Sequence, residues 1–338
     1  MIFVIVSMIY IPMIIASNII VFWGILLYPG FYTSNNFLLM NLAVYDGMVG
    51  LVCLPMYMLC YSDLTKEFIS DSKYLCLIRF CSVIMFAGGS IHALLFLSID
   101  RYIAVMWPLR YCSLVTNERM IRVLVALGVY MFTISMLPIM GWNFYDYNVK
   151  NLNERCHAYR VLPQIYIIWS TVIALQMCIW VSVILNVQII YIVLQQIKAS
   201  KKTLPTWSND SIVQFENRIS SVKVTVVLML LFIILWLPFI LVAPLKIKKV
   251  LSPATTEVIK TYAMIMFFAN SAVNAAIYAI LREEYKEVYT VMLTSWPWNW
   301  KNNLRKLHRE LNYKYSIARF RRTYDVESSI LNSEMCLS

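Results

Sequence analysis

Residues 74–106 read YLCLIRFCSVIMFAGGSIHALLFLSIDRYIAVM, a run that is apolar almost throughout. A helix of about 20 apolar residues crosses the hydrocarbon core of a bilayer, so this run is long enough to span one. Backbone groups that lack hydrogen bonds are costly in lipid, and the run is therefore expected to be helical. Its polar end, Asp100-Arg101-Tyr102, is expected to lie at a membrane surface.

The rest of the chain repeats this pattern. Hydrophobic residues make up 60% of the 338 and charged residues 14%, whereas soluble domains carry roughly 45–50% apolar and about 25% charged residues. Short polar connections separate the apolar runs. The predicted fold is an all-α membrane protein, a seven-transmembrane helix bundle over residues 1–281. The expected spans are about 3–27, 35–60, 74–106, 118–140, 163–195, 218–245 and 256–280.

Beyond the last span, residues 282–293 predict a short amphipathic helix. Tyr285, Val288, Tyr289 and Met292 follow the spacing i, i+3, i+4, i+7, which puts them on one face of a helix. We expect this eighth helix to lie along the inner membrane surface. Residues 294–338 are polar and basic, and are expected to form a disordered cytoplasmic tail.

Polar residues inside the spans need a reason, because they are expensive in lipid. One reading is that they form hydrogen bonds between helices, worth about 0.6 kcal/mol each. That reading suits Asn18 but not the carboxylate of Asp46, which has no Lys or Arg at its depth. Oxygen ligands around one carboxylate suit a small hard cation such as sodium. The residues that could share that depth are Asn18, Ser90, Asn270, Ser271 and Asn274.

The triplet Asp100-Arg101-Tyr102 allows two interpretations. An arginine beside an aspartate at a helix end can simply reach the membrane surface as a local ion pair. Here, however, the triplet closes the third of seven spans and follows Cys76 by 24 residues. That context favours a functional role.

Taken together, these features resemble a rhodopsin-class (class A) G-protein-coupled receptor over residues 10–290. The matching elements are Asn18, the segment Asn41 to Asp46, Cys76, Asp100-Arg101-Tyr102, Cys156, Phe232, Trp236-Leu237-Pro238 and the segment Asn274 to Tyr278.

The resemblance implies a receptor that passes an extracellular signal to a heterotrimeric G protein and performs no catalysis. Arg101 would be the switch, held by Asp100 at rest and released to meet the G protein. Tyr102, Asn274 and Tyr278 would belong to the same machinery. The chain would be a multi-pass plasma membrane protein in contact with membrane lipids, with its N-terminus extracellular and its C-terminus cytoplasmic.

Two further sites are implied by the resemblance alone. Cys76 and Cys156 would form an extracellular disulfide. An allosteric sodium ion would bind Asp46, Ser90, Asn270 and Asn274 and favour the inactive state; no other cofactor is expected.

Residues 108–111 (PLRY) and 138–143 (PIMGWN) are most similar to the adenosine receptor subfamily. Yet Ala158, Ala243 and Phe268 stand where those receptors contact a nucleoside. The expected ligand is instead small and apolar or lipid-like, with an adenosine or nucleoside receptor and a chemosensory receptor as alternatives. These residues could also merely pack together, leaving a receptor that is active without ligand. The pocket lining implied by the resemblance is Val83, Ile84, Ala87, Trp236, Phe239, Ile240, Ala243, Phe267 and Phe268.

The sequence also departs from the family pattern near the switch. Ala275 and Ile179 replace prolines, and Arg218 stands where many members carry a glutamate that locks the switch arginine. Val187 stands where the family has a tyrosine that meets the switch arginine. Tyr191, one helical turn further on, could take the place of that tyrosine. These departures predict altered basal activity or a diverged, weakly coupling receptor.

Other classes of function fit less well. A transporter would need internal repeats and several charges along a path, whereas Asp46 is the one carboxylate deep in the spans. His92 lacks the partner ligands of a metalloenzyme. The net charge of +11 does not indicate nucleic acid, because ten basic residues lie in the tail between Arg282 and Arg322.

Overall fold

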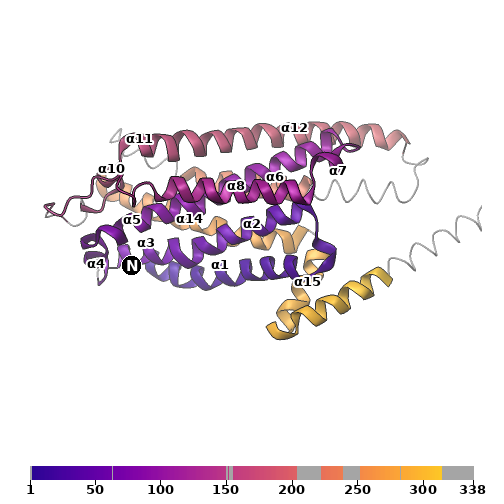
Figure 1. Cartoon of the computed structure of the whole chain (residues 1–338), viewed down its shortest axis with the longest axis horizontal. Coiled ribbons are helices and arrows are strands. Elements are labelled where there is room, and N and C mark those ends of the chain that lie inside the picture. The colour runs from indigo at the N-terminus through magenta and orange to yellow at the C-terminus, as the bar shows by residue number, and fades with distance from the viewer. Residues whose placement is uncertain are drawn as a thin grey trace, which may run out of the picture.

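The computed structural model is a bundle of long helices that run side by side along its long axis (Figure 1). No strand occurs in the part of the chain that is described, and the predicted all-α fold is confirmed. The structure describes residues 2–62, 64–149, 151, 155–203, 222–238, 252–281 and 283–313.

The helices follow the predicted spans closely. The first span is α1 (Ile2–Leu27), and the fourth is α8 (Asn117–Met136). The second consists of α2 (Ser34–Met48), the π-helical segment η2 (Val49–Cys53) and α3 (Leu54–Tyr61). The third consists of α5 (Lys73–Ser82), the π-helical segment η3 (Val83–Ala87) and α6 (Gly88–Met106).

The later spans are built the same way. The fifth consists of α11 (Gln164–Ile167), the π-helical segment η4 (Ile168–Ile173) and α12 (Ala174–Thr203). The described part of the sixth is the helix Val222–Pro238. The seventh is α14 (Pro253–Leu281), and α15 (Glu283–Thr294) follows it. Shorter connecting elements are η1 (Pro29–Phe31), α4 (Lys66–Asp71), α7 (Tyr111–Leu114), α10 (Ala158–Val161) and η6 (Pro297–Asn299).

Two helix ends differ from the predicted spans. The fourth helix ends at Met136 rather than near residue 140, because Pro138 has no backbone N–H to continue it. The fifth continues to Thr203 instead of residue 195, because the polar residues there end the apolar run without ending the helix.

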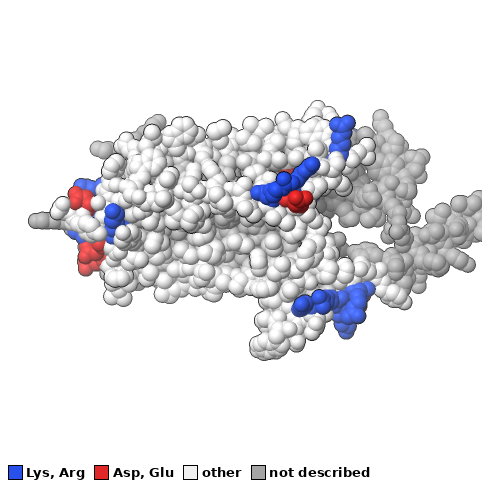
Figure 2. Space-filling model, viewed as in Figure 1, with Lys and Arg blue, Asp and Glu red and all other residues white. Residues whose placement is uncertain are grey.

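The surface of the bundle matches a bilayer. Five of the described helices are long and apolar enough to cross one, and Val222–Pro238 is a shorter apolar helix. The asparagines of α14, Asn270 and Asn274, are buried. In Figure 2 the coloured charged residues lie toward the two ends of the bundle, with an uncharged belt between them. On the fourth helix, Val125, Val129 and Phe132 are exposed apolar side chains.

Small residues bring neighbouring spans close together. A Cβ atom added at Gly89 of α6 would lie 2.3 Å from the Tyr45 ring of α2. One added at Gly50 would lie 2.7 Å from Ile14 of α1. Such contacts matter in a membrane, where close packing rather than the hydrophobic effect holds helices together.

The apolar face of α15 is buried against protein rather than laid on lipid. Tyr285, Val288, Tyr289 and Met292 are all under 9% exposed. The Tyr285 ring stacks on Phe31 at 4.2 Å between ring centroids, and its hydroxyl donates to Asn36 Oδ1 at 2.7 Å. The predicted amphipathic spacing is present, but this face packs on the first helix and the turn that follows it.

The expectation of a disordered tail from residue 294 is wrong for residues 297–313. Residues 297–299 form η6, and residues 300–313 form a further helix. Leu304 is fully buried, while Leu307 and Leu311 pack on the same core. This spacing supplies the apolar face that a stable helix needs. Residues 314–338 lie outside the described residues.

Candidate signalling site

One end of the bundle is fixed by the Cys76–Cys156 disulfide, as the resemblance predicted. The bond ties the first turn of α5 to the loop before α10. Arg79, one turn further along α5, donates to the backbone carbonyl of Cys156 at 2.7 Å. Its guanidinium also lies 4.3 Å from the centre of the Phe80 ring, within the range of a cation–π contact. Sequence reasoning missed Arg79, whose partner is visible only in the folded chain.

A column of aromatic rings runs through the bundle below this end. Phe232 lies 5.1 Å from Trp236 between ring centroids, and Trp236 lies 4.6 Å from Phe267. Phe267 in turn contacts Phe268 at 4.9 Å. All four side chains are buried. The column therefore joins the sixth and seventh helices through ring contacts.

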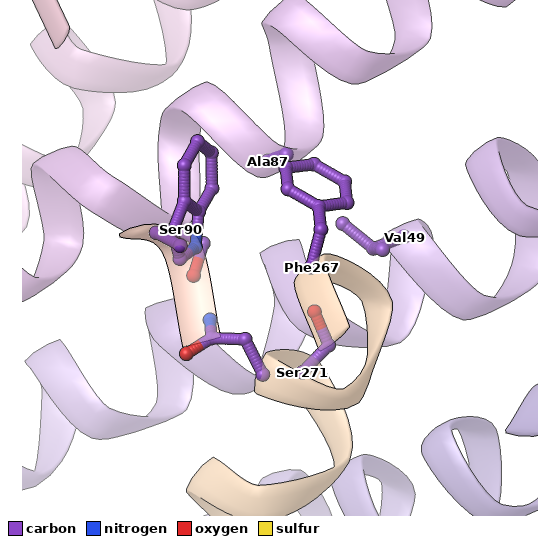
Figure 3. A pocket seen from close by; sticks show the side chains of 7 residues that line it. Val49, Ala87, Ser90, Phe267 and Ser271 are labelled. Carbon is purple, nitrogen blue, oxygen red and sulfur yellow. The ribbon is translucent and has the colours of Figure 1, made fainter. Parts of the chain in front are cut away.

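A small cavity lies beside the column (Figure 3), and the Phe267 ring points toward its Ala87 and Val49 wall. The cavity volume is about 10 Å³, roughly the space for the centre of one water molecule. It therefore suits a water or a small ion rather than an organic ligand. Its lining residues are Val49, Ala87, Ser90, Trp236, Phe267, Asn270 and Ser271.

The other residues of the predicted ligand pocket are dispersed. Ile84 packs in a separate cluster with the disulfide, while Val83 is half-buried against the main core. Phe268 faces the first two helices, at 6.2 Å from Phe3 and 5.7 Å from Tyr57 between ring centroids. Phe239, Ile240 and Ala243 lie outside the described residues. The structure thus brings together Ala87, Trp236 and Phe267 from that set.

Below the cavity, Asp46 is fully buried and accepts three side-chain hydrogen bonds. Ser90 and Ser271 donate to its Oδ1, each at 2.9 Å, and Asn274 donates to its Oδ2 at 2.8 Å. Among the described residues no lysine, arginine or histidine forms an ion pair with Asp46. The carboxylate therefore has hydrogen-bond donors but no described cation to balance its charge.

Asn270 and Asn18 complete this polar cluster. Asn270 lines the cavity and is 3% exposed, and its Oδ1 has no hydrogen-bond partner among the described residues. Asn18 donates to the backbone carbonyl of Ser271 at 3.0 Å, which links the first helix to the seventh. A buried acceptor without a donor is unusual. The cluster offers carboxylate, hydroxyl and amide oxygens around a small space, a set that fits a hard cation.

At the opposite end of the bundle from the disulfide, Asp100 holds two partners. Arg101 forms an ion pair with its Oδ2, and the Tyr111 hydroxyl donates to its Oδ1 at 2.8 Å. Asp100 is 2% exposed. Burial and the neighbouring carboxylate raise the pKa of Tyr111, so its hydroxyl stays protonated and remains a donor at neutral pH. Tyr111 lies on α7, and sequence reasoning missed its role because only folding brings this loop back to the third helix.

The remaining switch residues are placed as follows. Tyr102 packs half-buried against Val105, Ile189 and Val222, a cluster from the third, fifth and sixth helices. Asn274 belongs to the Asp46 cluster. Tyr278 lies in α14, but its side chain is outside the described residues, as is Arg218. Tyr191 is 63% exposed, so it does not replace the missing tyrosine of the fifth helix in this conformation.

The fold and these clusters define the class: a seven-helix membrane receptor with a signalling end and a disulfide-bridged end. Comparison with known proteins gives the family. Residues 17–278 match the family described as 7 transmembrane receptor (rhodopsin family), and the chain belongs to it. It is therefore a class A G-protein-coupled receptor of the plasma membrane rather than an enzyme.

Among individual proteins, the chain is similar to adenosine receptors. It is 27% identical over 291 residues to adenosine receptor A2b of Gallus gallus, covering 81% of this chain and 83% of the relative. It is 26% identical over 292 residues to adenosine receptor A2b of Homo sapiens, covering 81% and 84%. For adenosine receptor A3 of Canis lupus familiaris the identity is 23% over 288 residues, covering 83% and 87%. The relationship is distant along the whole bundle.

Proposed function

We propose that this receptor passes an extracellular signal to a heterotrimeric G protein through Arg101. Its N-terminus and the Cys76–Cys156 bridge face outside, and its C-terminus faces the cytoplasm. The observation that carries the proposal is the buried Asp100, whose two oxygens engage Arg101 and Tyr111. This arrangement represents a resting state in which the arginine is held.

Activation requires Arg101 to leave Asp100 and meet the G protein. The apolar cluster around Tyr102 joins the third, fifth and sixth helices, so a movement of the sixth helix disturbs the surroundings of Arg101. A packed cluster of this kind switches between discrete arrangements rather than deforming continuously. The aromatic column from Phe232 to Phe267 offers a path by which a ligand at the outer end reaches that helix.

The test is a cell assay of basal cAMP, calcium and G-protein recruitment, with wild type compared with Arg101→Ala at equal surface expression. We expect wild type to recruit a G protein and the variant to lose that recruitment. Arg122→Ala is a matched control, because this arginine is exposed on α8 and pairs only weakly with Glu118 at 3.8 Å. Equal signalling by wild type and Arg101→Ala would contradict the proposal.

For the ligand we favour a small apolar or lipid-like molecule. The support is the sequence of the predicted pocket residues, which are almost all apolar and offer little for polar recognition. The cavity of about 10 Å³ beside Ala87 and Phe267 is too small for such a ligand, so binding requires these side chains to move apart. A chemosensory receptor would use such a lining in the same way. A panel of lipids and apolar odorants in the recruitment assay tests this assignment. Activation lost in Phe267→Ala, but kept in the exposed variant Phe132→Ala, supports it.

A nucleoside ligand is the second candidate, favoured by the similarity to proteins named adenosine receptors. Two observations weigh against it. Ala158 offers no ring on which a purine would stack, and Phe268 is buried against Phe3 and Tyr57. A screen of nucleosides separates the two candidates: activation by a nucleoside and by no apolar compound would reverse our preference.

The Asp46 cluster is proposed to bind a sodium ion that favours the resting state. Asp46, Ser90, Asn270 and Asn274 would supply its oxygen ligands, and Ser271 adjoins them. The support is that carboxylate, hydroxyl and amide oxygens surround a small cavity. In particular, Asn270 Oδ1 has no hydrogen-bond partner among the described residues and lies beside a cavity the size of one water or small ion. Thermal unfolding of purified receptor in sodium against potassium chloride tests it. Sodium stabilises wild type and leaves Asp46→Asn unchanged; the same response in both would contradict sodium binding.

A further inference from the structure

The C-terminal hairpin consists of α15, the turn at residues 295–299 and the helix over residues 300–313. The indole N–H of Trp300 donates to the carbonyl of Met292 at 2.9 Å and contacts that of Ser295 at 3.2 Å. Met292 is in the last turn of α15 and Ser295 follows its end. Carbonyl groups at these positions have no N–H donor within the helix. Leu304 is fully buried, and His308 meets Tyr28 edge-on at 5.2 Å. The hairpin is therefore a packed part of the fold.

The turn of the hairpin exposes a large apolar surface. Trp296 and Trp298 are 66% and 71% exposed and stack on each other at 4.9 Å between ring centroids. Leu293, in the last turn of α15, is also 71% exposed. Tryptophan favours the boundary between lipid and water, where its ring is in apolar surroundings and its N–H is wet. In Figure 1 the turn lies at the level of the last turns of α1, beside the membrane-spanning part of the bundle.

The helix that follows carries positive charge on its exposed side. It holds four basic residues and one acidic residue, Glu310, which gives a net charge of 4 − 1 = +3. Figure 2 shows the blue patch over this helix. Glu310 lies 3.8 Å from Lys306 and offsets one of the charges. The exposed basic residues are Lys301, Arg305, Lys306 and Arg309.

From these observations we infer that the C-terminal hairpin is a membrane anchor that binds anionic lipid headgroups of the cytoplasmic leaflet. Trp296, Trp298 and Leu293 enter the interface, and the basic side chains contact headgroups beside them. An apolar patch next to a basic face is the combination by which helices recognise anionic membranes. The leaflet follows from the orientation proposed above, whereas the lipid binding itself does not depend on signalling.

The first test measures where the two exposed tryptophans lie. Full-length receptor is placed in phosphatidylcholine nanodiscs whose acyl chains are brominated near the headgroup. The fluorescence of Trp296 and Trp298 is isolated by subtracting the spectrum of the Trp296→Phe/Trp298→Phe variant. We expect brominated lipid to quench this difference, because indole rings favour the interface, where the bromine atoms lie. An unchanged difference would place the turn in water or against protein and overturn the inference.

The second test measures the headgroup preference by amide hydrogen exchange in the hairpin. Each basic residue near an anionic surface strengthens binding about fivefold, so phosphatidylserine is expected to slow exchange at least about tenfold. A variant that replaces all four basic residues by glutamine loses this effect, whereas Asn302→Gln/Asn303→Gln keeps it. Both variants leave Trp300 and Leu304 intact, so the hairpin remains packed. No effect of phosphatidylserine on wild type, or an equal effect on the charge variant, would refute headgroup binding. Both leaflets of the nanodisc contain the same lipids, so neither test depends on the orientation or the signalling proposed above. If the signalling assay fails, the quenching and exchange results still decide whether the hairpin binds lipid.

Discussion

Replacing Tyr111 by phenylalanine is expected to raise basal signalling. The substitution keeps the aromatic ring of Tyr111 and removes its hydroxyl. That hydroxyl donates to Asp100 Oδ1 at 2.8 Å and lies 3.4 Å from the Arg101 guanidinium. In the resting arrangement this hydroxyl contacts both the buried carboxylate and the arginine that it holds, so we assign its loss to that arrangement.

The size of the effect follows from that bond. A hydrogen bond to a charged group contributes about 1.5–3 kcal/mol to stability. Tyr111 is half-buried, and water can replace part of the bond, so about 1–2 kcal/mol is a fair expectation. This corresponds to a five- to thirtyfold shift in the ratio of active to resting receptor. A receptor that is about 1% active at rest would then be about 5–25% active.

The assay is ligand-free G-protein recruitment in living cells, normalised to surface expression. Ser113→Ala is the matched control, because it removes a hydroxyl from the same short helix that bonds only to the Arg110 carbonyl. The double variant Asp100→Ala/Tyr111→Phe is expected to signal no more than Asp100→Ala alone, since both changes remove the same bond. Unchanged or lower basal recruitment in Tyr111→Phe would refute the reasoning.

Three further predictions concern the fold. Gly89→Ala places a Cβ 2.3 Å from the Tyr45 ring, and this overpacking is expected to cost about 1–3 kcal/mol of stability. The melting temperature of Gly89→Ala should therefore fall, and the double variant Gly89→Ala/Tyr45→Ala should recover part of the loss. Gly24→Leu intrudes on Val288, which lies 3.3 Å from an added Cβ, and is expected to speed hydrogen exchange in α15. Cys76→Ser removes the disulfide, worth about 2–5 kcal/mol, and surface expression is expected to fall, whereas Cys112→Ser, at an exposed free thiol, leaves it unchanged.

The spans were predictable because the bilayer imposes one requirement on each of them. Any chain that crosses it needs about 20 apolar residues with an internally hydrogen-bonded backbone, and the sequence shows this directly. Helix ends were less predictable. At Met136 the following Pro138 decided the end, whereas at Thr203 the helix outlasted its apolar run.

The hairpin was missed because its helix over residues 300–313 is polar overall. Polarity alone predicts disorder, but the segment also has apolar residues at the spacing of a buried helical face: Trp300, Leu304, Leu307 and Leu311. What the sequence lacked was the partner surface, which exists only after α15 packs on the first helix. The same holds for Tyr111, which lies ten residues after Arg101 and reaches Asp100 only when the loop folds back.

The polar cluster shows the opposite case. Asp46, Ser90 and Asn274 come from three helices, and the resemblance to the family predicts that they lie together, as their hydrogen bonds show. Resemblance was less informative for the ligand pocket, because side-chain direction depends on local packing. Phe268, for example, faces Phe3 of the first helix.

The most direct measurement of the central claim is GDP release from purified heterotrimeric G proteins by receptor in nanodiscs. The Tyr111→Phe receptor is expected to accelerate release above empty nanodiscs. The double variant Arg101→Ala/Tyr111→Phe is expected not to, because the freed arginine is what contacts the G protein. Acceleration that persists without Arg101, or its absence in every variant and with every G protein, would contradict the account.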